Sequence, residues 1–177
     1  MDLYILLLLS LLVIKRILEK DEFKKVLDDI FSIHDHENDN EGHLFLKHDK
    51  DHIFRAFGET SILTWDFFVW ANLNQQNKYD AVIAFLNNKN EKFGKQIFSE
   101  YIWLSKNPLV GHRLFGTALK FAKEKEFEYV TVNTVTSHPK SHKVAKFYEK
   151  MGFLKDSETY IAKIHEPESS QKTEENL

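Results

Sequence analysis

Residues from Ser105 to Phe153 hold the pattern with the most chemical information in this chain. A turn, an amphipathic helix, an alternating strand, a loop and a second helix ending at Gly152 follow one another there. This order predicts a strand–helix–strand unit in which a helix start lies beside a loop. Backbone N–H groups at a helix start attract anions, so the pattern favours an anionic cofactor at that point.

The turn before the first of these helices resembles a known cofactor loop. SKNPLVGHRLFG, beginning at Ser105, is similar to the pyrophosphate loop of the GNAT superfamily of N-acetyltransferases. That loop carries Gln or Arg, two spacers, Gly, one spacer, then Gly or Ala, often with Pro three positions before the Gln or Arg. Pro108 sets the register, which places Gly111 at the Gln/Arg position, Leu114 at the first glycine and Gly116 at the second.

The second helix resembles the same family. SHKVAKFYEKMGF, which begins at Ser141, shares Ala145, Phe147, Tyr148, Gly152 and Phe153 with the family's segment, and His142 takes the usual Asn position. The resemblance covers about 150 residues, from Val13 to Ile164. It implies acetyl-CoA as the acyl donor, a primary amine as the acceptor and no metal. The residues implied for cofactor binding are Leu104, Ser105, Gly111, His112, Arg113, Leu114, Phe115, Gly116, Thr117, His142 and Tyr148.

Two side chains are the expected catalytic groups. Acetyl transfer to an amine expels a thiolate, and a phenol can protonate it; in the family a Tyr at the position of Tyr148 commonly does so. The same spacing also suits a core residue one turn after Val144. An amine with a pKa near 10 must lose a proton before attack, and Glu100 is the carboxylate we expect as the base. Main-chain N–H groups around Leu104 are expected to hold the oxyanion.

Two departures from the family pattern leave a second interpretation open. Gly111 has no side chain to contact phosphates, although His112 and Arg113 beside it can supply charge. Leu114 places a bulky side chain where glycine normally lets the main chain approach the ligand. The chain is therefore expected to be an N-acetyltransferase or, alternatively, a GNAT-fold protein that no longer catalyses and binds a partner. The resemblance also leaves a homodimer open.

Element order predicts an α/β fold. A strand at 13–18 and a helix from Asp21 precede a short helix ending at Gly58, and three antiparallel strands follow at 61–73, 79–86 and 95–105. A helix at 113–125 then crosses over to a parallel strand at 129–135. The expectation is one domain, residues 13–165, whose mixed sheet has antiparallel N-terminal strands, a central parallel pair and helices on both faces.

The two ends differ from this domain. The apolar run at residues 3–14 is short for a hydrocarbon core of about 30 Å, so residues 1–12 are interpreted as an apolar arm or a short membrane-associating segment. Residues 166–177 hold four glutamates and one lysine, which account for the net charge of −3, and are expected to be disordered. A near-neutral remainder argues against nucleic-acid binding. The polar loop from His34 to His43 lacks the spacing of a metal site, and the absence of cysteine suits a cytoplasmic protein.

Overall fold

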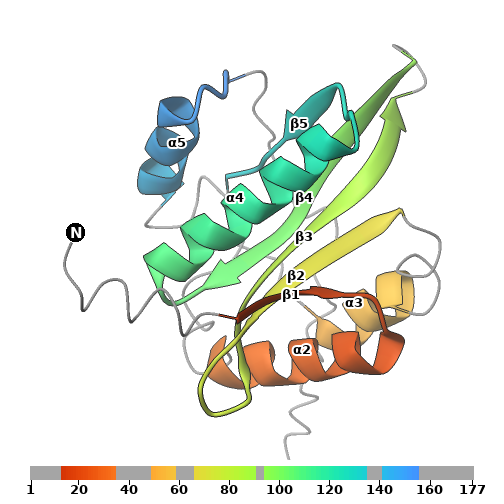
Figure 1. Ribbon diagram of the computed structural model, residues 1–177, viewed down its shortest axis with the longest axis vertical. Coiled ribbons are helices and arrows are strands. Elements are labelled where there is room, and N and C mark those ends of the chain that lie inside the picture. Colours follow the sequence, from red (N-terminus) through yellow and green to blue (C-terminus); the bar gives the residue numbers. More distant parts are fainter. Residues whose placement is uncertain (1–12, 35–48, 59–65, 91–93, 135–140, 156–177) are drawn as a thin grey trace, which may run out of the picture.

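A computed structural model describes residues 13–34, 49–58, 66–90, 94–134 and 141–155. Within these residues, one sheet has five strands in the order β1-β2-β3-β4-β5 (Figure 1). The strands are β1 (Val13–Ile17), β2 (Phe67–Leu73), β3 (Tyr79–Asn90), β4 (Lys95–Ser105) and β5 (Tyr129–Thr131). The pairs from β1 to β4 are antiparallel, while β4 and β5 are parallel. The expected mixed sheet, with antiparallel N-terminal strands and a crossover to a parallel strand, is confirmed. In the described residues the parallel pair lies at one end of the sheet and not at its centre.

Alternating residues of the strands form two cores, one on each face of the sheet. On β2, Phe67, Val69 and Ala71 belong to the first core. Phe68 and Trp70 belong to the second. Because successive strand residues point to opposite faces, helices must cover both sides of the sheet.

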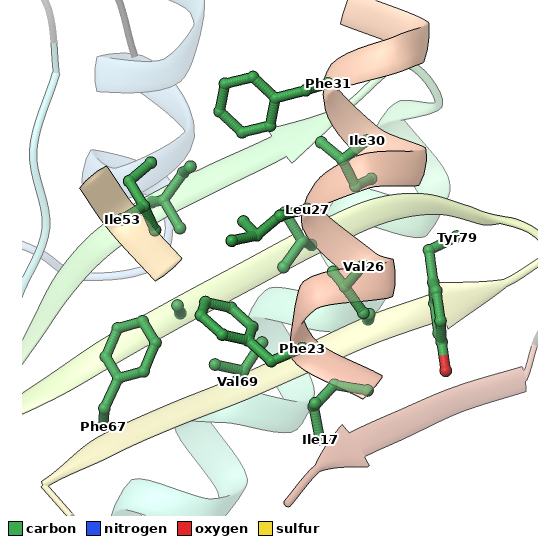
Figure 2. Close-up of a cluster of buried hydrophobic side chains, with 14 residues drawn as sticks. Ile17, Phe23, Val26, Leu27, Ile30, Phe31, Ile53, Phe67, Val69 and Tyr79 are labelled. Carbon is green, nitrogen blue, oxygen red and sulfur yellow. The ribbon is translucent and has the colours of Figure 1, made fainter. Parts of the chain in front are cut away.

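The helix α2 (Lys20–His34) covers the first face. Phe23, Val26, Leu27 and Ile30 recur at helical spacing and are almost fully buried against the sheet (Figure 2). A short helix α3 (Lys50–Ile53) and a π-helical turn η1 (Phe54–Gly58) complete this layer.

The helix α4 (Pro108–Glu124) covers the second face, and α5 (Ser141–Lys150) packs against the same core. Leu114, Phe115 and Ala118 of α4 have no exposed surface. Complete burial of a side chain such as Leu or Phe stabilises a fold by ~1.5–3 kcal/mol. Leu114 and Phe115 therefore anchor the first half of α4 on the sheet.

The parallel pair is short, and β4 is irregular beside it. Pairing between β4 and β5 covers residues 97–99 and 129–131. On its other side, β4 carries a bulge at Tyr101, because Phe85 pairs with Glu100 whereas Ala84 pairs with Ile102. The bulge reverses which face the following residues occupy.

Several element boundaries differ from expectation. The helix α4 begins at Pro108 rather than Arg113, because Asn107 caps it. The helix α2 begins at Lys20, so that Asp21 lies in its first turn. The strand β5 ends at Thr131 and not at residue 135, since its described pairing with β4 stops there.

The expectations about the ends and the polar loop fall largely outside the described residues. Val13 and Ile14 belong to β1, which confirms the interpretation of 13–18 as a strand. Residues 1–12, 35–48 and 156–177 are not described. Among the described residues, no helix has both the length and the apolar character needed to cross a membrane.

Candidate active site

The two expected catalytic side chains meet where β4 and β5 diverge. Tyr148 of α5 donates a hydrogen bond of 2.6 Å from its hydroxyl to Oε2 of Glu100. Glu100 is the first residue of β4 beyond the last parallel pair, Ser99 with Thr131. The sequence identified each group separately, and the fold brings them together across 48 positions of the chain.

The end of α5 fixes the position of Tyr148. Gly152, at a φ of +88°, lets the chain turn out of the helix. The N–H of Gly152 donates to the carbonyl of Glu149 and the N–H of Phe153 donates to the carbonyl of Tyr148, each at 3.0 Å. This is a Schellman motif, and it places the Phe153 ring 5.8 Å from the Tyr148 ring. Tyr148 is 5% exposed, so its hydroxyl is held on Glu100.

The main chain at Glu100 is also held. The side-chain amide of Asn133 donates to the carbonyl oxygen of Glu100 at 3.2 Å, and the Thr131 hydroxyl donates to the Ser99 hydroxyl at 3.0 Å. Asn133 thus bridges β4 and the segment after β5 at the point of divergence. Asn133 is not among the site residues predicted from the sequence. A polar residue just after a strand of a parallel pair was the signal that could have found it, because ligands bind at such strand ends.

Burial sets the protonation of this pair. Burial raises the pKa of Glu100 to about 7, although the hydrogen bond from Tyr148 opposes the rise. The pKa of Tyr148 is raised by burial and by the neighbouring Glu100 charge. Near neutral pH the phenol is therefore protonated, whereas Glu100 exchanges its proton readily. A carboxyl group with this pKa can act as a base or an acid at physiological pH.

A second Tyr–Glu pair shows that a tyrosine beside a glutamate does not by itself raise the pKa of the carboxyl group. Tyr79 donates from its hydroxyl to Glu22 at 2.5 Å. Lys15 also bonds to Glu22 at 2.7 Å, and hydrogen bonds from Lys15 and Tyr79 lower the pKa of Glu22. Glu22 stays ionised in a structural ion pair. Glu100 differs because it is largely removed from water and has no cation beside it among the described residues.

The segment expected to form the cofactor loop is helical. Asn107 accepts a hydrogen bond on Oδ1 from the Leu109 N–H and another on its carbonyl from the Gly111 N–H, both at 3.0 Å. Pro108, at the first helical position, has no N–H. Beyond this turn, α4 continues without interruption to Glu124, so its N–H groups serve the helix.

Side chains of this segment lie in several different environments. Leu114 and Phe115 belong to the core. Gly111 is buried so closely that a Cβ there would lie 3.3 Å from both Ser105 and Trp103. Gly116 is exposed, and a Cβ there would meet nothing within 4 Å.

The expected polar ligands of the cofactor are placed as follows. His112 is exposed on α4, and its ring stacks on Phe147 of α5 at 4.5 Å. Arg113 is half-buried, and its carbonyl accepts from the Thr117 hydroxyl at 2.9 Å. His142 is exposed in the first turn of α5. The side chains of His112, Arg113 and His142 are the polar groups through which this region could contact a phosphate.

The two residues at the end of β4 are separated from the pair. Leu104 packs against the core on the α2 face, opposite Tyr148. Ser105 donates from its hydroxyl to the Asn107 carbonyl at 2.8 Å, next to the cap of α4. Past Ser99, the Glu100 carbonyl accepts from Asn133. The later residues of β4 have no β5 partner within the described residues, so a ligand could use the edge beyond Glu100.

The residues fit one end of acetyl-CoA and not the other. A proton-exchanging carboxyl group and a phenol suit the thioester end, where a thiolate leaves. The diphosphate end requires main-chain N–H groups in a loop, and here the capped helix uses them. In the described residues no group of three or more His, Cys, Asp or Glu side chains could hold a metal ion.

Comparison with known proteins gives matches at the level of structure. No family model and no curated protein matches the sequence. An aminoglycoside acetyltransferase from an uncultured soil metagenomic sample matches with a TM-score of 0.61 and 16% identity, over 88% of this chain and 98% of that one. The ribosomal-protein-alanine N-acetyltransferase of Brucella melitensis matches at 0.60 and 10%, over 86% and 98%. A Trypanosoma brucei acetyltransferase matches at 0.58 and 11%, over 86% and 99%. The chain therefore has the fold of the GNAT acetyltransferases.

Proposed function

We propose that this chain, which has the GNAT fold, is an N-acetyltransferase that moves an acetyl group from acetyl-CoA to a primary amine by direct attack. The observation that carries the proposal is the hydrogen bond of 2.6 Å between Tyr148 and Glu100 where β4 and β5 diverge. Together with the pKa of about 7 at Glu100, it gives a proton acceptor and a proton donor in contact. In the reaction an N–C bond forms, a C–S bond breaks, and one proton passes from nitrogen to sulfur.

Glu100 and Tyr148 would move that proton as a coupled pair. Ionised Glu100 accepts a proton from the amine. Because the pKa of Tyr148 is raised, the phenol gives up its own proton only if Glu100 returns one to the phenol oxygen. The proton released at the Tyr148 hydroxyl is then available to the leaving group. Asn133 and the bulge at Tyr101 would keep Glu100 on the α5 side of β4 throughout.

When bound, acetyl-CoA would supply an activated acyl group as a thioester. The edge of β4 beyond Glu100 is suited to hold its extended chain, since strand groups there lack a β5 partner in the described residues. His112 and Arg113 would contribute side-chain contacts at the far end.

A second function is favoured by the helical start of α4. A protein that kept the fold but lost catalysis would have no need of a diphosphate loop, and the segment 108–116 is helical. Such a protein would bind a partner without transferring an acyl group. The pair formed by Glu100 and Tyr148 argues for catalysis. A desolvated carboxyl group with no cation beside it in the described part of the chain destabilises a fold that gains nothing from it.

Thiol release in the presence of amines tests the proposal. The full chain would be incubated with acetyl-CoA and a panel containing a polyamine, an aminoglycoside, an amino sugar and peptides with a free N-terminus or lysine. We expect free thiol and acetylated amine in equal amounts, detected by a thiol reagent and by mass spectrometry. Glu100→Gln should lose at least about 100-fold in rate, and the matched control Glu22→Gln should stay within about threefold. Absence of product with every amine would favour the non-catalytic alternative.

A further inference from the structure

We infer that this protein recognises its acyl donor by the thioester and the pantetheine chain, and that the nucleotide diphosphate contributes little. The inference rests on the proposed function and specifies its donor class. Acyl thioesters of pantetheine, with or without the adenosine end, would be accepted to a similar degree. Three features of α4 and one of the candidate active site lead to this conclusion.

The first feature is that the helix start offers few N–H groups to an anion. At the N-terminus of a helix, the first N–H groups have no partner inside the helix and can bind phosphate. Here Pro108 has no N–H, and Leu109 donates to the side chain of Asn107. The Gly111 N–H donates to the Asn107 carbonyl. The cap thus leaves Val110 as the remaining amide of the first turn, and Val110 is buried.

The second feature is the close contact between α4 and the end of β4. A Cβ at Gly111 would lie 3.3 Å from Nε1 of Trp103 and 3.3 Å from the Cβ of Ser105. The indole nitrogen of Trp103 is itself enclosed, without a hydrogen-bond partner among the described residues. The main chain of α4 therefore rests directly on Trp103. A diphosphate placed between them would have to displace the first turn of the helix.

The third feature is the burial of Leu114 and Phe115, which opposes such a displacement. A loop at 111–116 would require Leu114 and Phe115 to leave the core, where both are fully buried. The Phe115 ring is also stacked with Trp103 at 5.3 Å, and His112 is stacked on Phe147. Unwinding would expose apolar surface on both sides of the helix. A diphosphate gains contacts with N–H groups only after this cost, so the helical form is retained.

The residues that would contact the thioester end of the donor are already in position. Glu100 and Tyr148 are in contact and are fixed by Asn133 and the Schellman motif. The edge of β4 beside them is not paired with β5 past Ser99 in the described part of the chain. Binding energy for a donor is therefore available at the thioester and along an extended amide chain. Pantetheine is such a chain, since it carries two amide groups that can pair with a strand edge.

Equilibrium binding tests this inference without depending on turnover. The full chain would be titrated calorimetrically with CoA, with pantetheine and with adenosine 3′-phosphate 5′-diphosphate, which is the nucleotide part of CoA. We expect dissociation constants for CoA and pantetheine within tenfold of each other, and no binding of the nucleotide at millimolar concentration. In steady-state thiol release, S-acetylpantetheine and acetyl-CoA should have kcat/KM values within tenfold.

The following binding results would each overturn the inference, and they can be told apart. CoA binding more than 100-fold tighter than pantetheine, or saturable binding of the nucleotide, would show that the diphosphate is held despite the helical start. Both results would leave acyl transfer intact. Failure of CoA and pantetheine alike to bind would overturn the inference and the proposed function together.

Discussion

Replacing Glu100 by Gln should make the protein more stable at high pH and leave it unchanged at low pH. Burial raises the pKa of Glu100 from 4.5 to about 7, and one pKa unit corresponds to ~1.4 kcal/mol. Between these two pH values the folded state binds the additional proton, so the free energy of unfolding of the wild type falls as pH rises. The total loss is at most about 3 kcal/mol by pH 8. Gln keeps an acceptor for the Tyr148 hydroxyl and carries no charge.

Urea denaturation followed by tryptophan fluorescence at intervals from pH 4.5 to 8.5 would measure the effect. The free energy of unfolding of Glu100→Gln minus that of the wild type should be near zero at pH 4.5. It should rise through pH 7 and level off at about 2–3 kcal/mol. The matched control Glu22→Gln should instead be less stable than the wild type by a nearly constant amount across this pH range. The pKa of Glu22 is lowered by Lys15 and Tyr79, so its contribution is present above pH 4.5 and is lost in acid. If Glu100→Gln and the wild type ran parallel at every pH, Glu100 would not be a buried carboxyl group of raised pKa.

Four further substitutions test other parts of the structure. Tyr148→Phe removes a hydrogen bond that lowers the pKa of Glu100. The pKa of Glu100, followed by carbon NMR, should therefore rise above 7, and the rate of thiol release should fall at least about 100-fold. The control Tyr79→Phe should change neither the pKa of Glu100 nor the rate. Leu114→Gly, which restores the residue of the family loop, should lower the free energy of unfolding by about 3–5 kcal/mol in urea, because the side chain is fully buried. The two glycines of α4 should respond differently to alanine. Gly116→Ala should raise the free energy of unfolding by about 0.5–1 kcal/mol, because its Cβ would meet nothing within 4 Å. Gly111→Ala should gain less, because its Cβ would lie 3.3 Å from Trp103.

Each of these substitutions has an outcome that would contradict the structural interpretation. A Leu114→Gly protein as stable as the wild type, with CoA bound more tightly, would mean that the segment forms a loop in solution. Equal responses of Gly111 and Gly116 to alanine would remove the evidence for close contact between α4 and β4. An unchanged rate in Tyr148→Phe would assign that phenol a structural role.

Much of the fold follows from local patterns in the sequence. Side chains of β2 alternate between the two faces of the sheet, and apolar residues of α2 and α4 recur at helical spacing. Both patterns arise because each element must bury its own apolar side chains. The boundaries of β4 were predicted without error for the same reason. These features depend on neighbours a few residues apart, and such neighbours are visible in a sequence.

The helix α4 begins five residues before the predicted start, although the sequence contains the signal for the earlier one. The family register made Pro108 a marker of the loop, so the helix was expected to begin at Arg113. Asn followed by Pro is also the preferred pair for an N-cap and a first helical residue. In the structure the cap determines the boundary, and Leu114 lies in the core.

The contact between Glu100 and Tyr148 could not be derived from spacing alone. A regular strand would place Glu100 on the same face as Ile102 and Leu104, which pack on the α2 side. The bulge at Tyr101 adds one residue and reverses the faces, so Glu100 points toward α5. A bulge depends on the partner strand, and no residue of β4 indicates it in advance.

The pH dependence of kcat/KM for thiol release from acetyl-CoA, with a single amine acceptor, tests the central claim most directly. With the acceptor's own titration measured separately, the wild-type profile should contain one step at the pKa of Glu100, about 7. Glu100→Gln should lose this step along with most of its rate, while Glu22→Gln should retain both. A step near pH 7 that persisted in Glu100→Gln at an undiminished rate would contradict the assignment of Glu100 as the proton acceptor.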